Sequence, residues 1–382
     1  MTYGNLYSIN DKAIYDALHQ SKLTKSDLKD LFLARGIVIS ADASREDLAR
    51  YFSRLLHDYY DYQALAKRLG ATSRRDKSTV SYVDMGQLTI DDIEDAANDI
   101  NELLKEYDAV AQVNRVKDKV EIVVNYRVTN FNKNEFSQVV NREGVINLEI
   151  EDGKLLIRSP LTDTVENVKK VLIKKASEDN NVQLSVENIN MTGIGNPDKR
   201  TEFFKFLVYN LEGLKHHDVT DVFIYNPKNK SESADDEVDD FEESESEANS
   251  VDDSALGVHI TRASLKGERV LNSGEIKGLY SKGFYIWKIV WQSVEDSYDS
   301  DIYEFEAQFN NAEDFTDFSY LARGYYKYKK AGEYNSSKIG FSSMMERKLG
   351  AKIEKAAQEA IQHISSDDDK PLGEDHDQGE SS

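Results

Sequence analysis

Near the beginning of the chain, apolar residues recur at the spacing of an amphipathic helix. Leu28, Leu31 and Phe32 follow one another at i, i+3 and i+4, which places them on one helical face. Arg35-Gly36 is typical of a helix end, because glycine adopts the left-handed conformation without strain and a cation suits the last turn. The pattern predicts a short helix that ends at this dipeptide.

Residues that cap helices stand where this helix and a second one would begin. Thr24 and Asp27 have the spacing of a capping box, with Asp in place of Glu or Gln, and Ser44 is followed by Asp47 at the same spacing. We expect the second helix to continue to Gly70. Its inward face is predicted to carry Leu48, Tyr51, Phe52 and Leu55.

Beyond residue 88, alternating and helical patterns follow one another. Two apolar runs meet at Asp152-Gly153, a dipeptide favoured in type I′ turns, so a hairpin is expected there. Thr89 is expected to cap a helix that reaches Tyr107. The other expected helices cover 11–20, 162–175, 200–211 and 342–364, and the strands cover 110–116, 119–129, 182–191, 218–226, 256–265, 268–271, 283–293 and 301–310.

These elements predict an α+β fold, with a small N-terminal helical domain followed by a mixed, mostly antiparallel α+β body. The expected ranges are a helical module at 1–70, a basic polar linker at 71–87, an α+β domain at 88–227, an acidic disordered segment at 228–254, a β-rich region with a C-terminal helix at 255–364, and an acidic disordered tail at 365–382. The acidic segment either joins two domains or is a long loop between two strands of one sheet. The β character on both sides favours the loop.

Charge is distributed unevenly along the chain. The net charge is −22, yet 12 acidic residues and no Lys or Arg lie within 231–254. Residues 1–80 instead carry 13 Lys and Arg against 10 Asp and Glu. A tract of this composition cannot bury enough apolar surface to fold, so disorder is expected. The separation of the two signs is compatible with self-association or autoinhibition, but acidic tracts more often serve only to keep a chain in solution.

Composition limits the chemistry that the chain can perform. Without cysteine there is no disulfide, no cysteine nucleophile and no cysteine-based zinc site. No run of 18 apolar residues is present, so no membrane partner is expected. Met1 leads into a polar segment without a secretory signal, and we expect a cytoplasmic protein with no cofactor and no metal.

The segment 24–55 resembles the SAP/HeH-type helix–extended–helix module. Leu28-Lys29, Leu31, Arg35-Gly36-Ile37, Arg45 and Leu48 carry the resemblance. That family binds nucleic acid mostly by shape and backbone charge, so the resemblance implies phosphate contacts from the basic residues of the module. The family usually has a glycine just before its second helix, where this chain has Ala43 and Ser44, and the connection here is longer. A helical hairpin that only docks on a partner is the alternative interpretation.

Twelve basic residues are candidates for nucleic-acid binding. They include a basic linker run and the lysines of 324–330, where tyrosine and lysine alternate as in surfaces that combine phosphate contacts with base stacking. The candidates are Lys25, Lys29, Arg35, Arg45, Arg50, Arg54, Arg74, Arg75, Lys77, Lys327, Lys329 and Lys330.

Candidate catalytic groups are few. Glu149, Glu151 and Lys154 surround the predicted hairpin tip, and Glu304 and Glu306 alternate along a predicted strand. Alternating charges on an amphipathic strand usually mark its solvent face, and we expect that arrangement for both glutamates.

Two further motifs have simple interpretations. The adjacent histidines at 216–217 are expected in a loop or turn rather than on a metal. The two glycines at 193 and 195 are expected to mark a turn and a helix start.

We therefore expect a nucleic-acid-associated protein that binds by backbone charge, with DNA as the expected ligand, and that acts as an anchor, sensor or accessory subunit. A protein partner or self-association is also expected. The segments RGI–SREDLARYFS and SRRDKST resemble accessory proteins of bacterial antiphage systems. The alternatives are an interaction subunit without nucleic-acid contact and a metal-dependent hydrolase whose carboxylates are distant in sequence.

Overall fold

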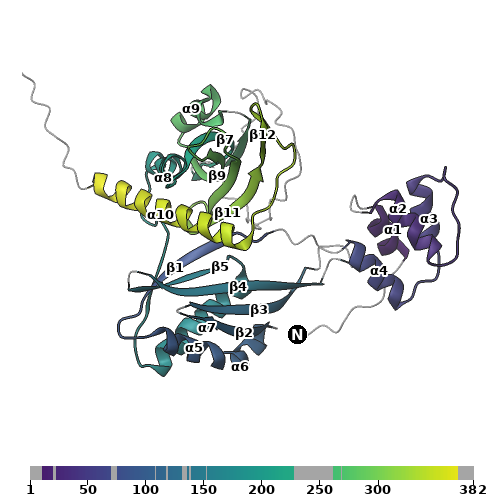
Figure 1. Cartoon of the computed structure of the whole chain (residues 1–382), viewed down its shortest axis with the longest axis horizontal. Helices are drawn as coiled ribbons and strands as arrows, with labels where there is room; N and C mark the ends of the chain where they lie inside the picture. The colour runs from purple at the N-terminus through teal and green to yellow at the C-terminus, as the bar shows by residue number, and fades with distance from the viewer. Residues whose placement is uncertain are drawn as a thin grey trace, which may run out of the picture. The chain divides into compact units, whose positions relative to one another are not determined.

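The structure is a computed structural model of the chain (Figure 1). It describes residues 11–19, 23–69, 75–107, 109–117, 119–130, 136, 139–151, 153–227, 261–267 and 269–368. Two compact units alternate along the sequence. Unit 1 comprises Met1–Asp76, Met85–Ile150 and Thr162–Leu184, and unit 2 comprises Lys77–Asp84, Glu151–Leu161 and Ser185–Ser382. The predicted α+β class, with N-terminal helices before mostly antiparallel sheet structure, is confirmed.

Unit 1 contains a helical module made of α1 (Asp11–His19), α2 (Lys25–Leu33), α3 (Arg45–Ser53) and α4 (Tyr59–Leu69). Helices α1, α2 and α3 begin where the sequence predicts. The Asp27 N–H donates to Thr24 Oγ1 at 3.2 Å and the Thr24 N–H donates to Asp27 Oδ2 at 2.8 Å. Ser44 Oγ accepts from the Asp47 N–H at 3.0 Å. The module core consists of Ala13, Ile14, Ala17, Leu18, Leu23, Leu28, Leu31, Phe32, Leu48, Ala49, Phe52, Leu65, Leu69 and Phe136.

The end of α2 also follows the prediction. Gly36 has φ +73°, its N–H donates to the Leu33 carbonyl at 2.8 Å, and the Ile37 N–H donates to the Phe32 carbonyl at 3.0 Å. This pair of bonds is the Schellman arrangement that satisfies the last carbonyls of a helix.

The expected continuation of the second helix to Gly70 is wrong. Helix α3 ends at Ser53 and α4 begins at Tyr59. His57 Nε2 bonds to the Phe52 carbonyl at 2.9 Å, which satisfies a helix-end acceptor and turns the chain. Tyr51, expected on the inward face, is 60% exposed.

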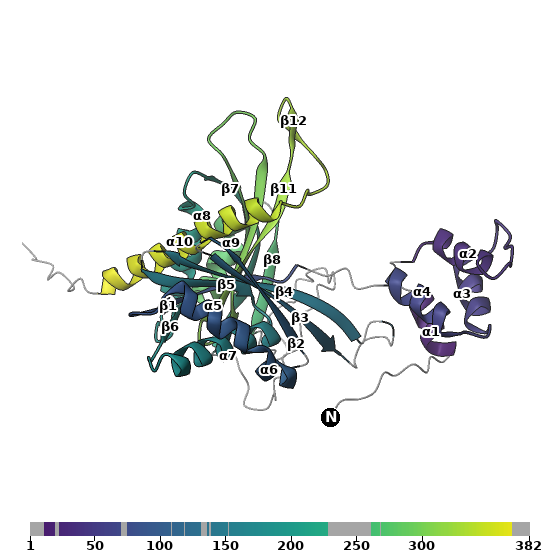
Figure 2. The same cartoon turned by 60° about the horizontal axis from the view of Figure 1, so that its bottom comes forward.

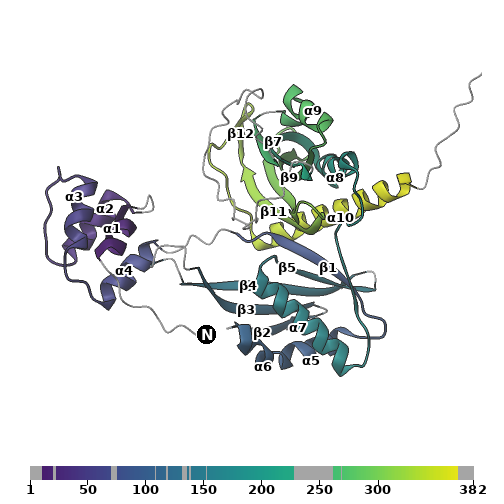
Figure 3. The same cartoon turned by 180° about the vertical axis from the view of Figure 1, so that it is seen from behind.

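Unit 1 also contains a sheet with strand order β2-β3-β4. The strands are β2 (Ala109–Val116), β3 (Lys119–Thr129) and β4 (Val139–Glu151), and the helices are α5 (Ile90–Asp99), α6 (Asn101–Leu104) with the 3₁₀ turn η1 (Lys105–Tyr107), and α7 (Asp163–Asp179). Along β3, buried and exposed positions alternate, as expected for a sheet with one covered face. Figure 3 shows α5 and α7 along one side of these strands.

Unit 2 is built on a second run of strands, in the order β5-β1-β11-β10-β9-β7-β8, and β6 also pairs with β1. Their bounds are β1 (Ser78–Asp84), β5 (Lys154–Pro160), β6 (Ser185–Asn188), β7 (Lys215–Tyr225), β8 (Arg262–Lys266), β9 (Tyr285–Val294), β10 (Ile302–Asn311) and β11 (Thr316–Tyr326). A small hairpin follows, formed by β12 (Tyr328–Lys330) and β13 (Glu333–Tyr334).

Helices α8 (Pro197–Tyr209) and α10 (Ser343–Asp368) lie together on one face of the unit 2 sheet (Figures 1 and 2). The 3₁₀ turn η3 (Val270–Asn272) and α9 (Gly274–Ser281) follow β8. Asn196 caps α8 by accepting the Asp198 N–H at 2.9 Å, as expected for the turn and helix start at the two glycines. The core between helices and sheet is strongly aromatic and includes Phe203, Phe204, Trp291, Phe305, Phe309, Phe315 and Phe318.

Several elements differ from the expectation. Residues 78–84, which were expected to belong to a polar linker, form β1 with mostly buried side chains. The expected strand at 268–271 is replaced by η3, and α9 was not expected. Helix α10 continues to Asp368, into the range expected to begin the acidic tail.

The acidic segment connects two neighbouring strands. Strands β7 and β8, which flank it, pair antiparallel with Tyr225 opposite Arg262. Of the two arrangements left open by the sequence, the structure therefore has the loop within one sheet. The segment 228–254 and residues 369–382 lie outside the described residues, and their predicted disorder stays a prediction.

Candidate nucleic-acid interface

Three of the predicted phosphate-binding residues of the helical module project from it. Lys25 is exposed and donates to the Ala41 carbonyl at 3.2 Å. Lys29 is half-buried and Arg54 is exposed. Within the described residues none of the three has an acidic partner. These cations can contact a phosphate without first breaking an ion pair.

Arg35 is directed inward instead. Its guanidinium lies 5.0 Å from the centre of the Phe52 ring, donates to His57 Nδ1 at 2.9 Å and forms an ion pair with Asp61. Because arginine only donates, His57 Nδ1 is the acceptor and its Nε2–H is the donor to the Phe52 carbonyl. Burial, and then the Arg35 charge, lower the pKa of His57. Arg35, which follows α2, therefore links α3 to α4 through its contacts with Phe52 and Asp61.

Arg45 and Arg50 are partly engaged by the module itself. Arg45 donates to the Leu18 carbonyl at 3.2 Å, near the end of α1. Arg50 forms an i,i+4 ion pair with Glu46 at 2.7 Å. Their charges are less available for phosphate than sequence alone indicates.

The remaining candidates lie elsewhere. Arg74 is outside the described residues, Arg75 is exposed, and Lys77 is largely buried in unit 2. Three exposed lysines lie in or next to β12: Lys327 precedes the strand, and Lys329 and Lys330 belong to it. The Tyr328 and Tyr334 rings pack 5.6 Å apart across that hairpin, so these tyrosines support the turn that presents the lysines.

The largest difference from the sequence interpretation is at Glu304 and Glu306. The expectation that they lie on a solvent face is wrong, because they are only 6% and 2% exposed. Strand β10 lies inside the sheet, between β9 and β11. Its even-numbered residues 304–308 form a buried polar row opposite the aromatic core.

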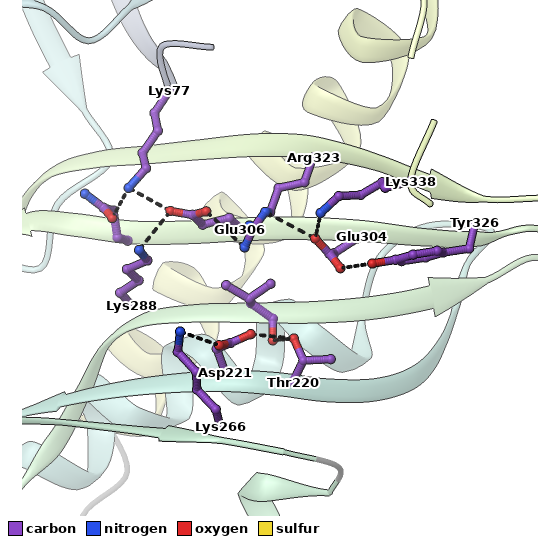
Figure 4. A network of polar contacts seen from close by, with 12 residues as sticks. Lys77, Thr220, Asp221, Lys266, Lys288, Glu304, Glu306, Arg323, Tyr326 and Lys338 are labelled. Carbon is purple, nitrogen blue, oxygen red and sulfur yellow. Dashed lines mark hydrogen bonds and ion pairs between the residues drawn. The ribbon is translucent and has the colours of Figure 1, made fainter. Parts of the chain in front are cut away.

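Basic side chains converge on both glutamates (Figure 4). Glu306 lies 2.7 Å from Lys77 Nζ and 3.2 Å from Lys288 Nζ. Glu304 pairs with Lys338, lies 3.2 Å from Arg323 Nε, and accepts from the Tyr326 hydroxyl at 3.4 Å. Lys77 precedes β1, Lys288 is in β9, and Lys338 follows β13, so no local sequence pattern could have shown this cluster.

Electrostatics keep Glu306 ionised. Burial alone would raise the pKa of its carboxyl group, but Lys77 and Lys288, with a smaller effect of Arg323, outweigh burial and lower the pKa to about 2. A carboxylate used as a metal ligand or general base needs a free lone pair directed at the metal or proton. Here the ammonium groups of Lys77 and Lys288 and the guanidinium group of Arg323 surround the carboxylate as counter-charges, which indicates a structural role.

The other catalytic candidates are also dispersed. Glu149 pairs with Lys119, and Lys154 lies 2.7 Å from Glu187. The expectation that His216 and His217 lie in a loop or turn is wrong, because both belong to the first residues of strand β7. No group of three potential metal ligands occurs in the described part of the chain.

A cleft of about 730 Å³ lies in unit 2 beside β5 and α10. At its base, Arg158 Nε donates to both carboxylate oxygens of Glu354, at 2.9 and 2.8 Å, and the Tyr320 hydroxyl donates to Glu354 as well. Both basic and acidic side chains line the cleft, in equal number, so it has no dominant charge. Sequence reasoning did not find this cleft, because its walls come from distant segments.

Comparison of the sequence with protein-family models and with curated proteins finds no significant match. Among the helices described here, none has both the length and the apolar character needed to cross a lipid bilayer.

Proposed function

We propose that the protein is a nucleic-acid-associated anchor or accessory subunit whose helical module holds the phosphate backbone of DNA. The observation that carries the proposal is the set of cations on α2 and at the end of α3. Lys25, Lys29 and Arg54 project from a packed helical core without acidic partners among the described residues, although the chain as a whole has a net charge of −22.

The mode of binding follows from the side chains available. Lysine and arginine on a helix surface neutralise phosphates, which positions a protein on nucleic acid but specifies no sequence. Arg35, the residue best suited to bidentate contact, is held by Phe52 and Asp61. We therefore propose weak binding without strong sequence preference.

Charge reversal tests the proposal in the full chain. The triple variant Lys25→Glu, Lys29→Glu and Arg54→Glu should bind a labelled 20-base-pair duplex about tenfold or more weakly than wild type at about 50 mM salt. The control is Lys170→Glu, Lys277→Glu and Lys348→Glu, which changes the net charge equally at exposed positions outside the module. Fluorescence anisotropy measures the affinities. An equal loss of affinity in both variants would mean that net charge alone explains the effect. No loss of affinity in the module variant would reject the module as the anchor.

A second candidate, an interaction subunit, is favoured by one apolar feature of the module. A groove of about 170 Å³ lies between α2 and the segment that follows it. Leu33 is 61% and Val38 is 85% exposed beside it, and clustered exposed apolar side chains often mark protein contacts. Sedimentation velocity of wild type and of Leu33→Ser with Val38→Ser tests for self-association, which the double variant should abolish while DNA binding persists.

A further inference from the structure

Aromatic and basic side chains form a cluster on three strands at the β8 edge of the unit 2 sheet. The Phe223 and Trp287 ring centres are 6.2 Å apart. The Arg262 guanidinium lies 5.5 Å from the Trp287 ring centre, and Lys288 Nζ lies 4.4 Å from that of Phe223. Cations and rings therefore alternate over β8, β7 and β9.

A β-bulge brings these side chains to one side. Phe223 pairs with Lys288, but the next residue, Ile224, pairs with Ile286. Trp287 is the extra residue on β9, and a bulge redirects side chains in this way. Both Trp287 and Lys288 consequently contact Phe223, while Ile224 and Ile286 enter the aromatic core.

The cluster is accessible at its outer side. Arg262, Ser264 and Lys266 alternate along β8 and are exposed, while Phe223 and Trp287 are half-buried. Strand β8 is the last in the order and pairs only with β7 among the described strands. Arg262 has no acidic partner in the described residues, and Lys266 has only Asp221, at 3.9 Å.

We propose that this cluster binds single-stranded nucleic acid, with Phe223 and Trp287 as stacking rings and Arg262 and Lys266 as phosphate contacts. Every base has a π face, so aromatic side chains next to cations bind single strands with little sequence preference. Guanidinium planes also stack on bases. A duplex hides its base faces and should bind here less well.

The inference rests on the proposed association with nucleic acid and adds a second site selective for single strands. Another polyanion is close in sequence, because the segment with 12 acidic residues at 231–254 connects β7 to β8. Occupation by that segment is therefore an outcome that the experiment must distinguish.

Tryptophan fluorescence reports on the cluster directly. The chain has two tryptophans, and Trp291 is fully buried, so Trp287 is the one that an added base can reach. Titration of the full chain with oligo(dT) of about 15 nucleotides, long enough for one such site, should quench its emission. Arg262→Glu with Lys266→Glu should abolish the quenching. Lys277→Glu with Lys348→Glu, which changes the net charge equally at exposed sites, should preserve it.

The outcomes separate this proposal from the helical-module anchor. Quenching that persists in the Lys25, Lys29 and Arg54 triple variant supports an independent site, even if the anchor itself fails its own test. Absence of quenching in wild type at low salt, or equal quenching by duplex, overturns the proposal. The last outcome comes from deletion of 231–254. If the deletion by itself shifts Trp287 emission, and oligo(dT) added to the deletion variant has no effect, then the acidic segment is the occupant of the cluster. The proposal is then overturned.

Discussion

Glu46 in α3 and Glu306 in β10 both face basic side chains, but in opposite surroundings. The side chain of Glu46 is 63% exposed and pairs with Arg50 one helical turn away. The side chain of Glu306 is 3% exposed and is approached by Lys77, Lys288 and Arg323 from three other segments. Solvent screens the first pair, so it contributes little, whereas a buried ion that loses its partner is strongly destabilising. The contribution of an ion pair to stability thus depends on its burial more than on its residue types.

The largest expected effect is at Glu306. Glu306→Gln keeps the shape but leaves Lys77 and Lys288 without their counter-charge, and should destabilise unit 2 by about 3–5 kcal/mol. Urea unfolding followed by tryptophan emission measures the loss, because both tryptophans, Trp287 and Trp291, lie in β9 of unit 2. A loss of stability below about 1 kcal/mol, in the range of exposed ion pairs, would mean that water replaces the carboxylate. Burial would then not distinguish the Glu306 cluster from the Glu46 pair.

The dependence of stability on pH tests the same comparison. The pKa of Glu306 is about 2 in the folded protein against an ordinary value of 4.5. A depressed pKa contributes stability that is present above pH 4.5 and is lost as the pH falls toward 2, about 3 kcal/mol in all. The stability difference between wild type and Glu306→Gln should therefore narrow from pH 6 to pH 3. A difference independent of pH over that range would contradict the ion cluster.

An intermediate effect is expected from the cap of α2. Thr24→Ala removes the acceptor for the Asp27 N–H and should destabilise the helical module by about 1 kcal/mol. Thr24→Ser keeps the acceptor and is the matched control. Circular dichroism during thermal unfolding distinguishes the two variants, and equal melting of both would show that the cap is not needed.

The smallest effect is expected at Glu46. Glu46→Gln breaks the exposed pair with Arg50 and should cost about 0.3–0.5 kcal/mol, decreasing further in high salt. Chemical unfolding at low and high salt measures both quantities. A loss comparable with that of Glu306→Gln would remove the distinction between the two regions.

The same contrast explains what sequence could predict. The caps at Thr24 and Ser44 and the glycine at the end of α2 depend on residues within one turn, so their positions followed from pattern alone. The burial of Glu306 depends on β10 lying between two strands and on Lys77, more than two hundred residues earlier. The alternation along β10 could be seen in the sequence, but the burial of both faces of the strand could not.

The candidate interface shows the same limit. The sequence pattern predicts Lys25 and Lys29 outside the apolar face of their helix, and in the structure Lys25 is exposed and Lys29 is half-buried. Arg35 is also basic and lies in the same stretch of sequence, but the break between α3 and α4 brings Phe52 and Asp61 to it. The cluster of Arg262, Trp287 and Phe223 needs three strands and a bulge, none of which a linear pattern reveals.

The central claim, phosphate contact by the helical module, is tested most directly by a salt titration of duplex affinity for the full chain and for the variant with Lys25, Lys29 and Arg54 replaced by Glu. Each phosphate contact contributes about 0.9 to the slope of log affinity against log salt. We expect a slope of about −3 or steeper for wild type, and a slope flatter by two to three units for the variant. A wild-type affinity that does not depend on salt, or identical slopes for the two proteins, would contradict the account.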